Sequence, residues 1–347
     1  MKNLNKLAFL LLYTLLSTTI FANQNFKYYP DETWITKKPS SMGWSEKKLN
    51  EAKNYFEKIG TTAVMVIDNG YIIAQWGDTK RRVNCHSVRK SFLSALIGIY
   101  ENEGKINLSS TLKELKIDDI QRLSTTEKKA KVSDLLKARS GVYHPAAYET
   151  KSMKRRRPQR GSHKPNTYYY YNNWDFNTLG TIFEKKTSKK IFSAFEESIA
   201  RNLQMSDFKA NDGKYKKEKV SLHRAYEFNM SARDRARFGL LYLRYGKWKN
   251  QQIIPKEWIK SSITPYSKVS KGMGYGYMWW TSTGKWHLGN KMKGHTYSAR
   301  GYWGQYIVIA PEENLVIVQV SDKKGGDKDG HGKKFNTLLK LILNAKK

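Results

Sequence analysis

Ser87 and Lys90 are the residues of this sequence whose types and spacing most directly suggest chemistry. They lie in the stretch Cys85-His86-Ser87-Val88-Arg89-Lys90-Ser91-Phe92, where a long apolar segment begins that predicts a helix from Lys90 to about Glu103. Residues three apart share a helix face, so the lysine amine can reach the serine hydroxyl. The first turn of a helix also offers unpaired N–H groups and partial positive charge. The pair therefore predicts an activated serine that attacks a carbonyl carbon.

The Ser-x-x-Lys pattern alone is weak evidence, because it occurs six times in the chain. The matches start at Ser45, Ser87, Ser110, Ser206, Ser282 and Ser321. Ser45 has the character of a helix N-cap, and only Ser87 precedes a long apolar helix. Cys85 is a second candidate nucleophile, but a buried small residue at the end of the preceding strand is the simpler interpretation.

The N-terminus has the layout of a signal peptide. Basic residues among positions 1–6 precede an apolar run, Leu7 to Leu16, and small and polar residues lead to Ala22. This pattern predicts cleavage after Ala22, with residues 1–22 as signal peptide and residues 23–347 as a single mature domain. The apolar run is too short for a good transmembrane anchor. We therefore expect a periplasmic or secreted protein with no transmembrane segment in its mature chain.

The composition predicts a folded globular chain with a strongly basic surface. The 347 residues are 39% hydrophobic and 13% aromatic, which suits a packed core and excludes a disordered chain. Cys85 is the sole cysteine, so no intramolecular disulfide can form. The net charge is +33, but the lysines are scattered and no nucleic-acid-binding signature accompanies them. A solvated surface, or contact with anionic polymers or lipid head groups of the cell envelope, fits better than nucleic acid.

The order of predicted elements indicates an α/β (α+β) fold. An amphipathic helix, residues 45–59, precedes two strands, 62–67 and 71–76, which Asp68-Asn69-Gly70 joins as a hairpin. The middle of the chain predicts helices over 132–139, 174–183, 191–203, 231–243 and 255–262. The last third predicts strands over 275–280, 296–300, 306–310 and 315–320, and a closing helix over 333–345. This order predicts one antiparallel sheet flanked by the terminal helices, beside a helical lobe, with a site in the cleft between them.

A long irregular segment, residues 143–170, is predicted within the helical middle. It contains the basic run Lys154-Arg155-Arg156-Arg157-Pro158-Gln159-Arg160. Long loops are often functional. The run is therefore either an anion-binding element for a substrate or a solvated loop.

Several motifs, in order along nearly the whole mature chain, resemble one known family. Ser87-Val-Arg-Lys90-Ser-Phe is similar to its first motif, and Tyr171-Asn172-Asn173 before Leu179-Gly180 is similar to its second, Tyr-x-Asn. The family is that of serine β-lactamases and penicillin-binding proteins, in its class C β-lactamase, D,D-peptidase and esterase branch. The third region, His295 to Gln305, has no Lys-Thr-Gly. Its Ala-x-Gly-x-x-Gly-Gln form resembles esterases and 6-aminohexanoate-dimer hydrolase, and the absent lysine argues against strong β-lactamase activity.

The resemblance implies a β-lactamase-like fold and a hydrolase that works through an acyl-enzyme on Ser87. Lys90 would be the base and Tyr171 the proton shuttle, although Tyr171 also fits an aromatic packed between lobes. Asn173 would orient Lys90 or hold the substrate. The oxyanion hole would combine the N–H of Ser87 with a backbone N–H near Ala299 and Gly301.

The resemblance implies no metal and no organic cofactor. The substrate would be a small or peptide-like acyl compound, either an ester or an amide. A β-lactamase, a D,D-peptidase acting on cell-wall peptides and a non-hydrolytic penicillin-binding sensor remain alternatives.

Overall fold

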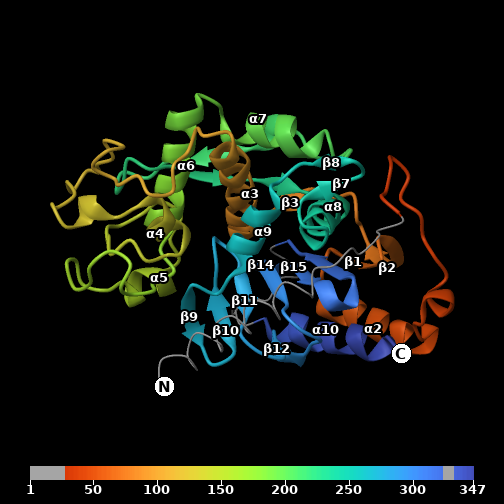
Figure 1. Ribbon diagram of the computed structural model, residues 1–347. Helices are drawn as coiled ribbons and strands as arrows, with labels where there is room; N and C mark the ends of the chain where they lie inside the picture. Colours follow the sequence, from red (N-terminus) through yellow and green to blue (C-terminus); the bar gives the residue numbers. More distant parts are fainter. Residues whose placement is uncertain (1–27, 323–331) are drawn as a thin grey trace, which may run out of the picture.

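An eight-stranded antiparallel sheet forms one part of the computed structural model, which describes residues 28–322 and 332–347 (Figure 1). The strand order is β2-β1-β16-β15-β14-β11-β10-β9, so strands from the two ends of the chain lie side by side. The strands are β1 (Ala63–Asp68), β2 (Tyr71–Gly77), β9 (Ser267–Ser270), β10 (Met273–Tyr275), β11 (Trp280–Ser282), β14 (Tyr297–Gly301), β15 (Gln305–Ala310) and β16 (Leu315–Val320).

Helices cover both faces of this sheet (Figure 1). The terminal helices α2 (Glu46–Ile59) and α10 (Lys333–Ala345) pack together on one face, over a core that includes Val64, Val308 and Ile317. On the other face, α8 (Ala232–Leu243) lies against β15 and β16. A side chain at Gly239 would come within 2.6 Å of Val316, so glycine there permits this close packing.

The helical lobe is built around α3 (Arg89–Asn102), which carries the candidate nucleophile at its start. Most residues of α3 are buried, because it lies between the sheet and the other helices of the lobe. The lobe also contains α4 (Val132–Leu136), α5 (Lys151–Arg156), α6 (Asn173–Thr187), α7 (Ile191–Phe195) and α9 (Lys256–Ile263). Two short strand pairs border the site: β3 (Val83–Asn84) with β6 (Asn229–Met230), and β4 (Lys214–Lys216) with β5 (Ala225–Glu227). The predicted α/β fold is confirmed.

Local sequence signals account for several element boundaries. Ser45 and Ser231 cap α2 and α8, each accepting a hydrogen bond from the backbone N–H three residues on. Asn69 and Gly70 adopt positive φ values of 53° and 91° in the β1–β2 hairpin, as an Asn-Gly turn requires.

The predicted strand 275–280 is wrong. β10 ends at Tyr275 and β11 begins at Trp280, with a turn between them. In that turn the N–H of Tyr277 donates to Ser262 O, and Met278 has a φ of 61°. Tertiary hydrogen bonds to the helical lobe therefore override the local strand pattern.

Other boundaries also differ from the prediction. The helices expected over 132–139 and 191–203 end at Leu136 and Phe195, and the second continues into a π-helical turn, Glu196–Ala200. The irregular segment 143–170 includes the short helix α5. The predicted signal peptide, residues 1–22, lies outside the described residues. Within the described part of the chain, no helix has the length and hydrophobicity to cross a bilayer.

Candidate active site

The structure brings Ser87, Lys90 and Tyr171 together. A 3₁₀ turn, His86–Val88, leads directly into α3 and places Ser87 one turn before Lys90. The Lys90 Nζ lies 3.0 Å from Ser87 Oγ and 2.7 Å from Tyr171 Oη, both within hydrogen-bonding distance. Tyr171 lies just before the start of α6, 81 positions after Lys90 in the chain.

Burial controls the protonation of this group. The Lys90 side chain is buried, and this burial, together with the neighbouring Arg89 charge, holds the pKa of Lys90 well below its ordinary value. Burial raises the pKa of Tyr171 to about 12, although its hydrogen bond to Ser87 and the Arg89 charge oppose the rise. The neutral amine and the protonated phenol are therefore favoured, so Lys90 is suited to accept a proton and Tyr171 to donate one.

Aromatic packing fixes the position of Tyr171. Its ring centroid lies 5.0 Å from that of Phe176, 5.8 Å from Tyr275 and 5.3 Å from Trp280. The aromatic role that the sequence left open for Tyr171 is thus present together with its contact to Lys90. The position of Tyr171 at the start of α6 accounts for both the aromatic packing and the contact to Lys90.

A buried polar network anchors the chain on either side of Tyr171. Asn172 caps α6 and donates from Nδ2 to Val142 O (2.7 Å) and to Asp175 Oδ1 (2.9 Å). The Ser140 hydroxyl donates to the same carboxyl oxygen at 2.5 Å. Burial raises the pKa of Asp175 well above its ordinary value.

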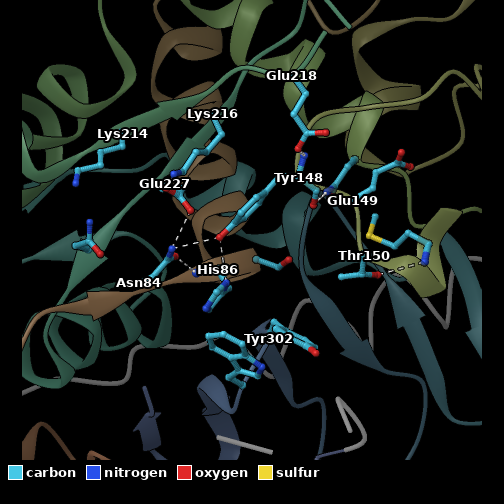
Figure 2. A pocket seen from close by; sticks show the side chains of 15 residues that line it. Asn84, His86, Tyr148, Glu149, Thr150, Lys214, Lys216, Glu218, Glu227 and Tyr302 are labelled. Carbon is cyan, nitrogen blue, oxygen red and sulfur yellow. Dashed lines mark hydrogen bonds and ion pairs between the residues drawn. The ribbon is translucent and has the colours of Figure 1, made fainter. Parts of the chain in front are cut away.

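Ser87 is one of the residues that line a cleft of about 610 Å³. Figure 2 shows this cleft from close by. One wall is aromatic: the His86 ring lies 6.0 Å from Tyr302 and 5.3 Å from Trp303, measured between ring centroids. His86 also has a positive φ of 45°, and its N–H donates to Asn84 Oδ1 at 2.7 Å. Strained backbone of this kind often marks functional sites.

The carboxylates of Glu227 and Glu218, on the opposite side of the cleft, form hydrogen bonds or ion pairs with other residues of the protein. Glu227 accepts a hydrogen bond from Asn84 (2.9 Å) and pairs with Lys216 (3.5 Å). Glu218 accepts from the N–H of Tyr148 (2.7 Å). The Tyr148 hydroxyl lies 3.2 Å from Nδ1 of His86, so this tyrosine connects both walls (Figure 2).

Asn173 also lines the cleft, but it makes no hydrogen bond to Lys90 in the described structure. Its Nδ2 donates to Tyr148 O at 2.7 Å, whereas its buried Oδ1 has no partner among the described residues. Of the two roles predicted for Asn173, the geometry therefore favours holding a substrate N–H over orienting Lys90.

The strand β14 presents a partly open edge beside Ser87. It pairs with β15 from Tyr297 to Gly301, but β11 pairs only with Tyr297 and Ser298. Thr296 O accepts from the N–H of Ser282, on the β11 side. Because backbone groups alternate along a strand, those of Ala299 and Gly301 point toward β15, and those of Arg300 point toward the open edge.

The two residues predicted for the oxyanion hole therefore differ from expectation. Alternation leaves the Ala299 N–H facing the β15 ladder. Gly301 matters by its size: a side chain there would come within 2.6 Å of Cys85 O and 3.1 Å of Ser87 N. The open edge instead offers the N–H of Arg300, or of Tyr302 in the following turn, which lines the cleft with Ser87.

Two arginines of the basic run are part of the framework. Arg160 pairs with the buried Glu127 at 2.8 Å and donates to backbone carbonyls of residues 121 and 122. Arg157 pairs with Glu149 at 2.5 Å. These two contacts favour the structural role for this half of the run over anion binding.

Cys85 is fully buried beneath the site. Burial raises the pKa of its thiol to about 11, so the reactive thiolate is disfavoured. The interpretation of Cys85 as a packed small residue agrees with this placement.

Sequence reasoning missed Arg89, Tyr148 and Arg300. Arg89 and Arg300 lie inside motifs that drew attention for other residues, and Tyr148 lies in the irregular loop. Arg89 could have been found from the sequence, because it directly precedes the candidate base Lys90. No spacing pattern marks the other two, since their neighbours come from distant segments.

Comparison with known proteins identifies the family and the fold of this chain. The β-lactamase family model matches residues 51–341. A solved structure described as a 6-aminohexanoate-dimer hydrolase from Bacillus anthracis superposes with a TM-score of 0.64 at 19% identity, covering 92% of this chain and 88% of that one. A β-lactamase/D-alanine carboxypeptidase from Pseudomonas syringae gives 0.64 at 15% identity, with 86% and 98% covered.

A third solved structure, a class C β-lactamase, superposes with a TM-score of 0.63 at 16% identity and covers 87% of this chain and 97% of that one. No curated protein sequence matches the chain. At these identities the structural similarities establish the fold, and the family model covers most of the sequence. The chain belongs to the β-lactamase family, whose members are serine hydrolases of the β-lactamase and penicillin-binding-protein type.

Proposed function

We propose that this protein is an exported serine hydrolase that cleaves an ester or amide bond through an acyl-enzyme on Ser87. The observation that carries the proposal is the contact of the Lys90 amine with both Ser87 Oγ (3.0 Å) and Tyr171 Oη (2.7 Å). Nucleophile, base and acid are then within reach of one another before substrate binds.

In acylation, Ser87 Oγ attacks the carbonyl carbon while the neutral Lys90 amine takes its proton. The oxyanion is stabilised by the N–H of Ser87 and by a backbone N–H at the open edge of β14, from Arg300 or Tyr302. Tyr171 gives its proton to the departing alcohol or amine as the bond to the carbonyl carbon breaks. The Lys90 ammonium then returns a proton to Tyr171, which restores the starting state.

In deacylation, water attacks the acyl carbon and its proton passes to the Tyr171 and Lys90 pair. The bond to Ser87 Oγ breaks, and Oγ recovers that proton while the acid leaves. One water is consumed for each substrate cleaved, and no metal or organic cofactor enters either step.

The cleft supports an ester or linear amide substrate. It is wide, with an aromatic wall at His86 and Trp303 and an unpartnered acceptor at Asn173 Oδ1. The alternative within the same chemistry is a β-lactamase or D,D-peptidase, which the similarity to the Pseudomonas syringae structure supports. A non-hydrolytic sensor would form the acyl-enzyme and fail to release it.

The test is covalent labelling of the mature protein with a fluorophosphonate, followed by intact mass and peptide mapping. We expect one adduct on Ser87 that is absent from Ser87→Ala. Ser91→Ala is the matched control, because the Ser91 hydroxyl lies on the same helix but donates to Met278 O at 2.8 Å. An adduct that persists in Ser87→Ala, or no adduct at all, would contradict the proposal.

A substrate panel then separates the alternatives. Ser87-dependent turnover of nitrophenyl esters or anilides supports the hydrolase, and preferential turnover of nitrocefin or a D-alanyl-D-alanine peptide supports the β-lactamase or D,D-peptidase. A stable penicillin adduct without turnover supports the sensor.

A further inference from the structure

Arg89 is a buried positive charge that immediately precedes the candidate base in the chain. Its side chain is 1% exposed. Nη2 donates to Asn177 Oδ1 at 3.2 Å, whereas Nε and Nη1 have no hydrogen-bond acceptor among the described residues. No carboxylate of the described chain forms an ion pair with it. Burying a charge without a counter-ion is strongly unfavourable, so this arrangement calls for a physical reason.

The surroundings of Arg89 only partly compensate this charge. The guanidinium carbon lies 4.2 Å from the ring centroid of Tyr226 and 5.8 Å from that of Tyr148. Aromatic faces attract a cation, but more weakly than a carboxylate does. Asn177 lies on α6, Tyr226 on β5 and Tyr148 in the loop before α5, so each neighbouring element presents a neutral group.

The carboxyl groups that α6 and β5 carry close to Asn177 and Tyr226 in sequence are engaged elsewhere. Asp175 is held by Ser140 and Asn172, and burial raises its pKa, which favours the neutral acid. Glu227 is occupied by Asn84 and Lys216.

Lys90 likewise faces no anion. Its ammonium position contacts Ser87 and Tyr171 and lies 4.3 Å and 4.6 Å from the ring centroids of Tyr171 and Phe176. Two adjacent basic side chains are thus buried together with no negative charge to offset them. Because a second positive charge in a poorly solvated site is strongly disfavoured, one of the two must give up its proton. A guanidinium keeps its proton under all ordinary conditions.

We propose that Arg89 holds the Lys90 amine in its neutral, proton-accepting form, and so acts as a positioning residue for proton transfer from Ser87. This inference rests on the proposed function, because it concerns the base of that reaction. The guanidinium makes no contact with the reacting atoms. It acts through Lys90, by making the ammonium form unfavourable.

The experiment measures the pH dependence of kcat/KM, and of the rate of fluorophosphonate labelling, in Arg89→Met and Arg89→Lys. The wild type loses activity as the pH falls and Lys90 gains a proton. In Arg89→Met we expect this acidic limb to move to higher pH by about one unit or more. Arg89→Lys places at this position a side chain that can itself lose its proton, so its limb should lie between those of the wild type and Arg89→Met.

Arg244→Met is the matched control, because Arg244 is another buried guanidinium, 4.0 Å from the ring centroid of Tyr29. It lies at the C-terminal end of α8, beside the β1–β2 turn. Its loss should lower the melting temperature without moving the acidic limb. An unshifted limb in folded Arg89→Met, or an equal shift in Arg244→Met, would overturn the inference. Arg89→Gln replaces Arg89→Met if the latter does not fold.

A second readout separates this inference from the proposed function. In Ser87→Ala protein labelled with ¹³C-lysine, the Lys90 signal, assigned by its loss in Lys90→Met, reports the Lys90 pKa without any turnover. We expect a midpoint below those of the other lysines that rises when Arg89→Met is added. A normal midpoint, or one that Arg89→Met leaves unchanged, would refute the role of Arg89 whatever the protein hydrolyses.

Discussion

Tyr171 is the residue whose role is most open to a direct test. Its hydroxyl is 2.7 Å from Lys90 Nζ, and loss of a proton donor at this position lowers rates by about 10²- to 10⁴-fold. We expect Tyr171→Phe to lower kcat by that order while the fold is kept, because the ring contacts remain. Tyr169→Phe is the control, since Tyr169 packs against the same Tyr275 ring. Equal losses in both variants would mean that the effect is packing rather than proton transfer.

Gly301 gives a second prediction at the scale of one residue. A methyl group there would meet Cys85 O at 2.6 Å and Ser87 N at 3.1 Å, so Gly301→Ala should displace the nucleophile turn. We expect at least a tenfold loss of kcat/KM, because small misplacements of reacting groups are costly. Gly284→Ala should be silent, since a side chain at Gly284 meets nothing within 4 Å. Steady-state kinetics on both variants check this, and unchanged activity in Gly301→Ala would contradict it.

At the scale of elements, the loop that contains α5 is held by arginine contacts. Arg160 binds Glu127, which is buried and also lies 3.2 Å from Nε2 of His144. We expect Arg160→Met to remove the ion pair of the buried Glu127 and to make this loop more mobile. The free energy of unfolding should fall by about 1–3 kcal/mol.

The control for this prediction is Arg155→Met, which removes an exposed arginine of the same basic run. Denaturant unfolding measures stability, and limited thermolysin digestion measures loop opening, since thermolysin does not require an arginine. Faster digestion in Arg155→Met than in Arg160→Met would show that Arg160 does not anchor the loop.

Local signals predicted the elements that depend on local physics. The Ser45 and Ser231 caps and the Asn69-Gly70 turn were readable because each acts within a few residues. Ser87 and Lys90 were readable for the same reason, since one helical turn joins them. The position of Tyr171 required the register of the motif that follows it.

The features that the sequence did not predict depend on residues that are distant in the chain. The strand predicted over 275–280 does not form, because the Tyr277 N–H donates to Ser262 O in the helical lobe. The Ala299 N–H points toward β15, and the N–H groups that remain open on the other edge of β14 depend on where β11 stops pairing, at Trp280. No periodicity along the chain records either fact.

At the scale of the whole molecule, the predicted signal peptide is a proposal with a simple test. Expression in a Gram-negative host with export intact should yield a periplasmic protein whose first residue is Asn23, as intact mass and N-terminal sequencing would show. Blocking the export machinery should leave Met1 in place and the protein in the cytoplasm. A protein that retains residues 1–22 under permissive conditions would contradict the proposal.

The pairing of β1 with β16 has a consequence for how the chain comes to be folded. Ala63 lies opposite Val320, and the N–H of Ser45 donates to Ala345 O, so the two ends of the chain complete one another. The sheet therefore has a high contact order and cannot close until nearly the whole polypeptide is available. A polypeptide that threads through a translocon N-terminus first would thus remain without its central β-pairing until its last residues emerge.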